Sequence, residues 1–385
     1  MRVLILGIDG YIGHSLALHL LKKGYKVGGI DDFSRRRRVT EVGSNSLTPI
    51  ASEVDRDNLL GTFNDFLGRT RLYLPGKLEA VKTILRHYEP DTIVHLAEMP
   101  SAPWSMMDAL HSFITQSENI VGTLSLLWAM KEVCPTVHLI KLGTMGEYGT
   151  PELDIPEGMI DGCLISKDYG PCPLDRLPFP RSAGSFYHLS KVHDTHNIIF
   201  ACKIWGLCST DIMQGVVFGL NEYSSPEEIT RFDYDEYFGT VVNRFCVQSL
   251  IGHPLTIYGA GGQTRGYLPL KDSLQCLTIA IDNPPSPGEY RTLNQFESTY
   301  SVNSLAKLVT ECALDLGLKV DSGPIDNPRV EAEKHYYNPV HQKLFKLGYV
   351  PTTDIKGEIT KLIGQLDAFK SRIRPNVILP KTKWR

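Results

Sequence analysis

Short apolar runs alternate with longer amphipathic stretches through the first half of the chain. Residues 3–6 are continuously apolar, as expected of a strand that is buried on both faces of a sheet. From residue 12 to residue 21 apolar side chains recur every three to four positions, which predicts a helix, and Gly24 suits its C-terminal cap. Residues 26–30 then predict a second strand. Together these elements predict one βαβ unit.

The same alternation continues along the chain and sets the expected fold class. Further strands are predicted at residues 91–96, 137–142, 210–213 and 255–258, and helices at residues 119–133, 187–205, 237–250, 301–316 and 354–369. Strands that alternate with helices predict an α/β fold: a Rossmann-type, doubly wound parallel sheet with a smaller C-terminal α/β substrate domain. We expect the dinucleotide-binding domain over residues 1–215. The substrate domain would cover residues 216–385, with some segments returning to the first domain.

Residues 34–74 break this alternation. They begin with four consecutive arginines, at positions 35–38, and continue with a polar run over residues 43–49. We predict a long inserted segment, and a loop of this length usually has a function, such as that of a lid.

Composition excludes several classes of protein. The 385 residues are 42% hydrophobic and 22% charged with a formal net charge of -3, which predicts a globular chain without a general affinity for nucleic acid or anionic membranes. None of the eight cysteines forms a C-x-x-C pair, so we expect no metal site, and scattered thiols fit a reducing cytoplasm. No apolar run is long enough to span a membrane, and the chain opens on a strand and not on a signal peptide.

A glycine-rich turn joins the first strand to the first helix. In Gly7-x-x-Gly10-x-x-Gly13 the glycines let the backbone approach a pyrophosphate, and the helix N-terminus offers free N–H groups. Asp31 ends the next strand 18 residues after Gly13, near the expected offset of about 20 residues. A carboxylate there accepts hydrogen bonds from ribose hydroxyls and repels a 2'-phosphate, so the pattern predicts NAD and disfavours NADP.

The arginine run admits two interpretations: a solvated basic rim, or contacts with the phosphates of the cofactor. We give Asp31 more weight than the arginine run, so the expected cofactor is NAD. The expected cofactor-binding residues are Gly7, Gly10, Tyr11, Ile12, Gly13, Asp31, Asp32, Arg35, Arg36, Leu96, Asn119, Tyr187 and Lys191.

A tyrosine and a lysine four positions apart suggest redox chemistry. Tyr187 and Lys191 fall on one face of the predicted helix. An adjacent ammonium is expected to lower the pKa of Tyr187 towards neutrality, so that Tyr187 can take a proton from a sugar hydroxyl while hydride leaves. Thr144, at the end of a predicted strand, can share the same substrate oxygen. Purely structural alternatives are that Tyr187 and Lys191 form a surface pair on the helix and that the Thr144 hydroxyl caps a strand.

With these motifs the chain resembles the extended short-chain dehydrogenase/reductase family, which includes nucleotide-sugar epimerases, dehydratases and decarboxylases. The 4,6-dehydratases of that family carry Asp-Glu after the threonine, whereas Met145 and Gly146 follow Thr144 here. A thioether cannot donate a proton, so formation of a 6-deoxysugar is disfavoured.

Longer segments resemble one branch of this family, which forms a UDP-linked sulfonated hexose. They are residues 46–52, 101–103, 143–149, 186–194, 261–267 and 327–333. The resemblance implies UDP-glucose and sulfite as substrates and bound NAD+ as a catalytic oxidant, with C4 oxidation, loss of water across C5 and C6, sulfite addition at C6 and C4 reduction. It also implies a homodimer.

The resemblance implies the remaining roles. Thr144, Tyr187, Lys191 and Glu147 are the expected catalytic residues. For the C5 base and the C6 acid, Glu147 and His188 are both candidates. Arg329 suits the diphosphate, because a guanidinium matches it bidentately. The expected substrate-binding residues are Thr144, Met145, His188, Gln214, Gln263, Arg265 and Arg329.

Two positions depart from the branch. Met99-Pro100 stands where a basic residue is expected, and Leu74-Pro-Gly-Lys77 replaces the Gly-Asp whose aspartate contacts adenine. Two alternatives stay open: a UDP-sugar 4-epimerase or 4,6-dehydratase on the same scaffold, and a non-catalytic NAD-binding sensor. Dependence of turnover on sulfite separates them from the sulfosugar hypothesis.

Overall fold

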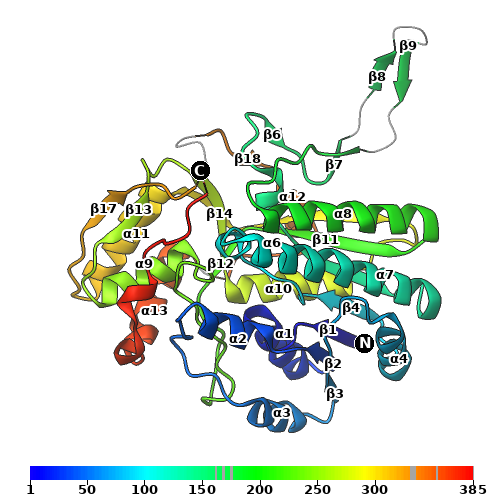
Figure 1. Cartoon of the computed structure of the whole chain (residues 1–385), viewed down its shortest axis with the longest axis horizontal. Coiled ribbons are helices and arrows are strands. Elements are labelled where there is room, and N and C mark those ends of the chain that lie inside the picture. The colour runs from blue at the N-terminus through cyan, green and yellow to red at the C-terminus, as the bar shows by residue number, and fades with distance from the viewer. Residues whose placement is uncertain (161–162, 167–169, 174–176, 330–334, 353, 385) are drawn as a thin grey trace.

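Seven parallel strands form the central layer of the protein. The computed structural model describes residues 1–385 except 161–162, 167–169, 174–176, 330–334, 353 and 385. The sheet has the order β15–β11–β5–β4–β1–β2–β3 (Figure 1). Its strands are β1 (Arg2–Leu6), β2 (Lys26–Asp31), β3 (Phe66–Arg71), β4 (Thr92–His95), β5 (His138–Thr144), β11 (Cys208–Gln214) and β15 (Tyr290–Gln295). The predicted doubly wound sheet is confirmed, and the strand order reverses between β1 and β4, which pair directly.

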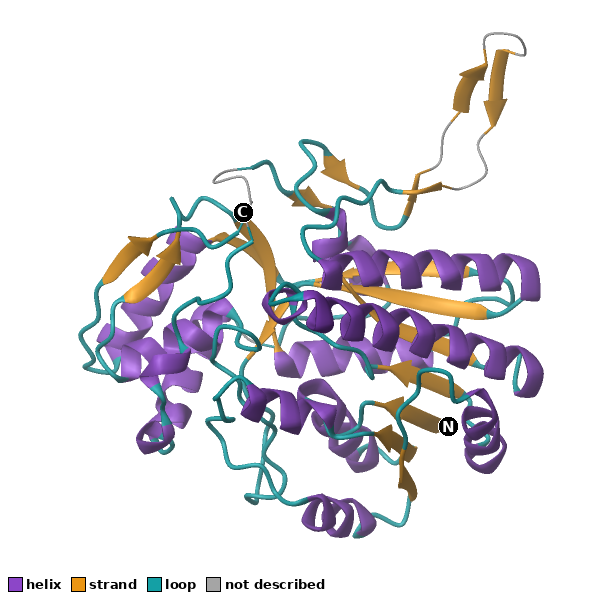
Figure 2. Ribbon diagram, in the orientation of Figure 1, coloured by secondary structure: helices purple, strands orange, loops and turns teal. Residues whose placement is uncertain are grey.

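Helices cover both faces of this sheet (Figure 2). Val3 and Ile5 of β1 pack into the core shared with α1 (Tyr11–Lys22) and α10 (Leu270–Asp282). Leu4 and Leu6 point to the other face, whose core includes side chains of α4 (Leu78–Tyr88), α7 (Gly122–Val133) and α8 (Phe186–Trp205). This double burial explains why the first strand is apolar at every position and not at alternate ones.

The segment after Asp31 is more ordered than the sequence predicted. It holds α2 (Ser34–Glu41), α3 (Glu53–Gly61) and the edge strand β3. The strand escaped the hydrophobic pattern because its sequence, FLGRTR, is only half-buried at the edge of the sheet. Within the polar run, Leu47 is fully buried in the core of the second half of the chain, and its N–H donates to the Phe232 carbonyl at 2.9 Å. The segment is therefore a packed part of the body.

The second half of the chain builds a smaller α/β unit. Its core lies between α9 (Val241–Leu250), α11 (Val302–Asp315) and α13 (Ile355–Asp367), beside the parallel pair β13 (Leu255–Tyr258) and β17 (Ser322–Ile325). The strand at residues 255–258 has its predicted bounds. A three-stranded sheet, β12–β14–β16, comprises β12 (Val216–Phe218), β14 (Thr264–Pro269) and β16 (Ser298–Ser301). Between these elements the chain returns to the large sheet to form α10 and β15.

Shorter elements complete the structure. They are α5 (Ala102–Ser105), α6 (Ala109–Gln116), the π-helix η1 (Ser117–Val121), η2 (Met145–Tyr148), β6 (Asp154–Ile155), β7 (Met159–Ile160), β8 (Cys163–Ser166), β9 (Gly170–Pro173), β10 (Leu177–Pro178), β18 (Asn338–Pro339), α12 (Gln342–Lys346), η3 (Lys370–Arg372) and η4 (Pro375–Val377). The antiparallel strands β8 and β9 project away from the body (Figure 1). Within the described residues, no helix is both long enough and apolar enough to traverse a membrane.

Candidate active site

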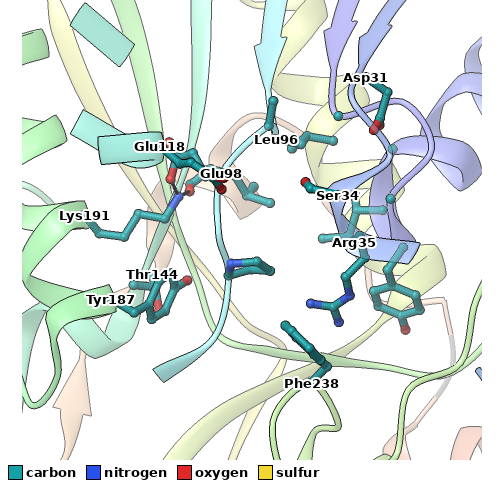
Figure 3. Close-up of a pocket in the computed structure, with 18 of the residues that line it drawn as sticks. Asp31, Ser34, Arg35, Leu96, Glu98, Glu118, Thr144, Tyr187, Lys191 and Phe238 are labelled. Atoms are coloured by element: carbon teal, nitrogen blue, oxygen red, sulfur yellow. Dashed lines mark hydrogen bonds and ion pairs between the residues drawn. The ribbon is translucent and has the colours of Figure 1, made fainter. Parts of the chain in front are cut away.

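A cavity of about 360 Å³ opens at the carboxyl ends of the central strands, beside the point where the strand order reverses. Ligands of open α/β sheets bind at this place. Most of the predicted cofactor residues lie on its wall (Figure 3). These are Gly7, Gly10, Tyr11, Ile12, Gly13, Asp31, Asp32, Arg35, Leu96, Tyr187 and Lys191. Of the predicted substrate residues, Thr144 and Gln214 line it as well.

The glycine turn has no room for side chains. Gly7 has a φ of +87°, and a Cβ there would lie 2.8 Å from the Leu96 carbonyl carbon. A Cβ on Gly13 would lie 2.0 Å from the Gly7 carbonyl oxygen. Gly10 caps α1, whose first N–H groups have no intrahelical partner. The turn thus forms a bare backbone cradle at a helix N-terminus, the arrangement that suits a pyrophosphate.

Asp31 ends β2 at the rim of the cavity. Its two carboxylate oxygens accept hydrogen bonds from the N–H groups of Asp9, at 2.7 Å, and Phe33, at 2.8 Å. Burial, together with the charge of Asp9, raises the pKa of Asp31 to about 6. Each carboxylate oxygen has two lone pairs, so the side chain can still accept hydrogen bonds from ribose hydroxyls. The fit of a dinucleotide rests on this acid and on the bare glycine cradle.

The arginines of the run at residues 35–38 differ in position: some line the cavity and others lie away from it. Arg35 lines the cavity, where its guanidinium lies 3.7 Å above the Phe238 ring and pairs with Asp233 at 2.7 Å. Arg36, which we expected at the cofactor, lies away from the cavity wall. It binds both carboxylate oxygens of Asp9 at 2.7 Å and so fixes α2 to the glycine turn. Arg38, which the sequence analysis did not single out, lines the cavity instead.

Asn119 supports the site from behind. Its side chain is fully buried in the π-helix η1, and its Oδ1 accepts a hydrogen bond from Met99 N at 2.7 Å. Its Nδ2 donates to Ser190 Oγ at 2.8 Å. Asn119 therefore joins the loop after β4 to α8 and does not line the cavity, in contrast to the expected cofactor contact.

Thr144, Tyr187 and Lys191 converge on one wall of the cavity (Figure 3). Thr144 ends β5, and its Oγ1 accepts a hydrogen bond from Gly146 N at 3.1 Å. Tyr187 and Lys191 lie one turn apart on α8, as their spacing predicted. These three residues are the ones that the proposed hydride chemistry needs close together.

The expected low pKa of Tyr187 is wrong for this structure. Burial of the phenol and the charge of Glu147 raise its pKa, and a hydrogen bond with Thr144 offsets only part of that shift. The Lys191 ammonium is directed elsewhere: it forms an ion pair with Glu98 and donates to the Leu142 carbonyl at 2.8 Å.

Glu147 and Met145 lie outside the cavity wall. The Glu147 side chain is fully buried, forms an ion pair with Arg181, lies 3.3 Å from Lys141 Nζ and accepts a hydrogen bond from Thr195 Oγ1 at 3.2 Å. Met145 is buried in an apolar cluster with Tyr148 and Phe179. In this structure the Glu147 carboxylate belongs to a buried charge network, and its catalytic role stays a prediction.

A second group of predicted residues gathers beside Tyr187. Burial, with the charges of Arg329 and Arg265, lowers the pKa of His188 to about 3. The His188 ring packs on Gly146, where a Cβ would meet Nε2 at 2.4 Å. Arg265 Nη1 lies 3.0 Å from His335 Nε2. His188, Arg265 and Arg329 thus form a positively charged group suited to an anion, although none lines the described cavity.

The other predicted substrate residues make protein contacts. Gln214 donates to Ser273 Oγ at 3.1 Å and to Gln295 Oε1 at 3.0 Å. Gln263 is buried and donates to the Tyr258 carbonyl at 3.2 Å. Residues 330–333 of the 327–333 segment lie outside the described residues. In the part of the chain that the structure describes, no group of three or more His, Cys, Asp and Glu side chains could hold a metal ion.

Sequence reasoning missed Glu98, Arg38 and Glu118, all of which line the cavity. A signal for Glu98 was present, because it follows a predicted strand at the edge of the sheet where ligands bind. Arg38 belongs to the arginine run that was considered for phosphate contacts, but it was not chosen from that run. Glu118 had no signal, since its ion pair with Arg38 joins segments that are 80 residues apart.

Comparison with known proteins identifies the family of the chain. The sequence model of the NAD dependent epimerase/dehydratase family matches residues 3–294. The whole chain is 46% identical to the chloroplastic UDP-sulfoquinovose synthase of Spinacia oleracea, over 79% of that protein. It is also 46% identical to the UDP-sulfoquinovose synthase of Sulfolobus acidocaldarius, over 98% of that protein.

Solved structures share the fold. The UDP-glucuronic acid 4-epimerase of Bacillus cereus, in complex with UDP-glucuronic acid and NAD, superposes with a TM-score of 0.68 at 21% identity, over 95% of this chain and all of that one. At this identity the likeness concerns the fold alone. By its sequence, the chain belongs to the NAD-dependent epimerase/dehydratase family and, within it, to the UDP-sulfoquinovose synthases.

Proposed function

We propose that the protein converts UDP-glucose and sulfite into UDP-sulfoquinovose with NAD as a bound cofactor. The observation that carries the proposal is the convergence of Thr144, Tyr187 and Lys191 on the cavity that the glycine turn and Asp31 also line. It occurs in a chain that is 46% identical over its whole length to two UDP-sulfoquinovose synthases.

Gly7, Gly10 and Gly13 would hold the pyrophosphate of NAD, and Asp31 the adenosine ribose. Bound NAD+ supplies a hydride acceptor at the start of the cycle and returns the hydride at its end. Tyr187 takes the proton of the C4 hydroxyl, and Thr144 holds the same oxygen. Because burial raises the pKa of Tyr187, its deprotonation depends on the charge of Lys191.

Oxidation at C4 makes the C5 proton acidic. Loss of that proton and of the C6 hydroxyl as water gives a 4-keto-5,6-ene. The sulfur lone pair of sulfite adds at C6, and C5 takes up a proton, which restores the 4-ketone for reduction. The pKa of His188, lowered to about 3, keeps its ring neutral near pH 7, so the ring can accept or donate a hydrogen bond without carrying charge. Of the two acid and base candidates we favour His188, because the Glu147 carboxylate is engaged in a buried charge network.

Arg265 and Arg329 are the proposed anion-binding side chains. Both raise the positive potential at His188, which adjoins Tyr187 in sequence and in space. A diphosphate and sulfite are both anions, and a guanidinium binds such oxygens through two N–H groups. We assign Arg329 to the diphosphate, and Arg265 to either anion.

The decisive assay is the mass of the nucleotide product from UDP-glucose and NAD, with and without sulfite. We expect UDP-sulfoquinovose only when sulfite is present. A sulfite-independent UDP-galactose or 6-deoxy product would instead make the protein an epimerase or a dehydratase. If UDP-glucose did not reduce the bound NAD, the protein would instead be a non-catalytic NAD-binding protein.

We also propose that the protein is a homodimer in the cytoplasm. Large apolar side chains are exposed on adjacent helices: Phe113 of α6, Trp128 of α7, and Phe200 and Ile204 of α8. An exposed apolar surface of this kind is typical of an interface, and a second copy would cover it. Six described cysteines are free thiols, which fits a reducing compartment. Light scattering after size exclusion should give about twice the mass of the chain, and Phe200→Glu should yield monomers.

A further inference from the structure

Glu98 is a buried carboxylate at the cavity that no predicted role uses. It lies in the loop after β4, and its side chain is 2% exposed. One carboxylate oxygen pairs with Lys191 Nζ (Figure 3). The other lies 3.5 Å from His95 Nε2. The carboxylate thus reaches the catalytic lysine of α8 from the loop after β4.

Lys191 needs a counter-charge. Its side chain is 5% exposed, and its other contact is the neutral carbonyl of Leu142. Burial lowers the pKa of the Lys191 ammonium to about 8, against the opposing charges of Asp194 and Asp211. Burial thus favours loss of the Lys191 proton, and a carboxylate in contact with the ammonium opposes that loss.

The other charged groups around Lys191 have further partners or carry less charge. Lys141 of β5 lies 3.3 Å from the Glu147 carboxylate and 3.6 Å from that of Asp211, so it shares both acids. Burial raises the pKa of Asp194 to about 7, which weakens it as a counter-ion. Burial lowers the pKa of His95 to about 3, so this ring is neutral. Among the ion pairs of the described residues, Glu98 is the carboxylate that contacts Lys191.

We propose that Glu98 is the positioning residue of Lys191: it keeps the ammonium charged and holds it at the cavity wall, so that Tyr187 can lose its proton. The inference rests on the proposed function insofar as hydride transfer at C4 needs that proton loss. Glu98 acts through Lys191, and its role differs from that of Asp31 at the ribose and of Thr144 at the sugar oxygen.

The test is Glu98→Gln, which keeps the shape of the side chain and removes its charge. UDP-glucose alone is mixed with enzyme saturated with NAD, and NADH fluorescence gives the rate of hydride transfer between about pH 6 and pH 10. An opposite charge in contact shifts a pKa by about one unit or more. We expect the alkaline limb of the profile to move down by about one unit, with a roughly tenfold lower rate near pH 8. Glu98→Asp, which retains the charge, should restore much of the wild-type profile.

Two further measurements distinguish loss of the positioning role of Glu98 from a failure to fold and from a failure of the proposed function. Methylation of the lysines with ¹³C-formaldehyde allows the pKa of Lys191 to be followed by NMR, with Lys191→Arg to identify its signal. That pKa should fall in Glu98→Gln. As a matched control, Glu118→Gln removes another cavity carboxylate, one that pairs with Arg38, and should leave the alkaline limb in place.

The inference would be overturned if Glu98→Gln folded and bound NAD but left unchanged the alkaline limb of the pH–rate profile or the pKa of Lys191. If wild-type enzyme showed no NADH signal with UDP-glucose, the proposed function would fail instead, while the NMR titration would still decide on Glu98.

Discussion

Replacement of Glu147 by glutamine separates a structural role from a chemical one. The carboxylate is fully buried between Lys141 and Arg181, and the nearby Asp211 is the other acid of this network. Two cations then share two anions, so the change to glutamine leaves one positive charge without compensation. Breaking a buried pair by removing one partner costs about 3–5 kcal/mol. The free energy of unfolding of Glu147→Gln should fall by this amount.

Urea unfolding followed by tryptophan fluorescence measures the loss. With an m-value of roughly 3–5 kcal/mol per molar urea, the midpoint should fall by about 1 M. A matched control is Glu132→Gln, whose partially exposed carboxylate pairs with Lys82 and is worth less than about 1 kcal/mol. Folded Glu147→Gln should still bind NAD and transfer hydride within roughly tenfold of the wild-type rate, because its side chain touches Thr144 only through a long backbone hydrogen bond of 3.4 Å. A variant as stable as wild type that transfers no hydride would refute this reasoning and return Glu147 to the chemistry.

Three further substitutions test the site. Gly13→Ala places a Cβ 2.0 Å from the Gly7 carbonyl oxygen and should weaken NAD binding by about tenfold or more in calorimetry, since the backbone must move; unchanged affinity would argue against the cradle. Tyr187→Phe should bind NAD normally yet lower the rate of NADH formation from UDP-glucose by about 100-fold or more, and a normal rate would exclude Tyr187 as the base. Arg329→Met should raise the KM for UDP-glucose by about tenfold through loss of a charge-assisted bond, whereas a change in kcat alone would place it at the reacting carbons.

Much of the site could be predicted because its signals are local in sequence. A glycine turn between a strand and a helix, an acid at the next strand end, and a tyrosine and lysine one turn apart each depend on short-range geometry. The structure accordingly brings Gly13, Asp31, Tyr187 and Lys191 to one cavity. The edge strand β3 could not be found in this way, because a half-buried edge strand lacks the apolar run that identifies its central neighbours.

Charge partners were decided by the tertiary structure alone. Arg35 and Arg36 are adjacent in the sequence, yet one pairs with Asp233 at the cavity and the other with Asp9 of the glycine turn. Likewise, Lys191 pairs with Glu98, 93 residues earlier in the chain, while the side chain of Glu147, three residues after Thr144, is buried in the core.

The alternation of strands and helices in the first half of the chain, the cofactor class and the placement of Tyr187 and Lys191 on one helical face thus followed from the sequence by itself, because period, turn geometry and helical spacing act over a few residues. The ion-pair partner of each buried acidic or basic side chain followed only from the fold, because an ion pair between distant segments depends on how the sheet and its loops bring them together.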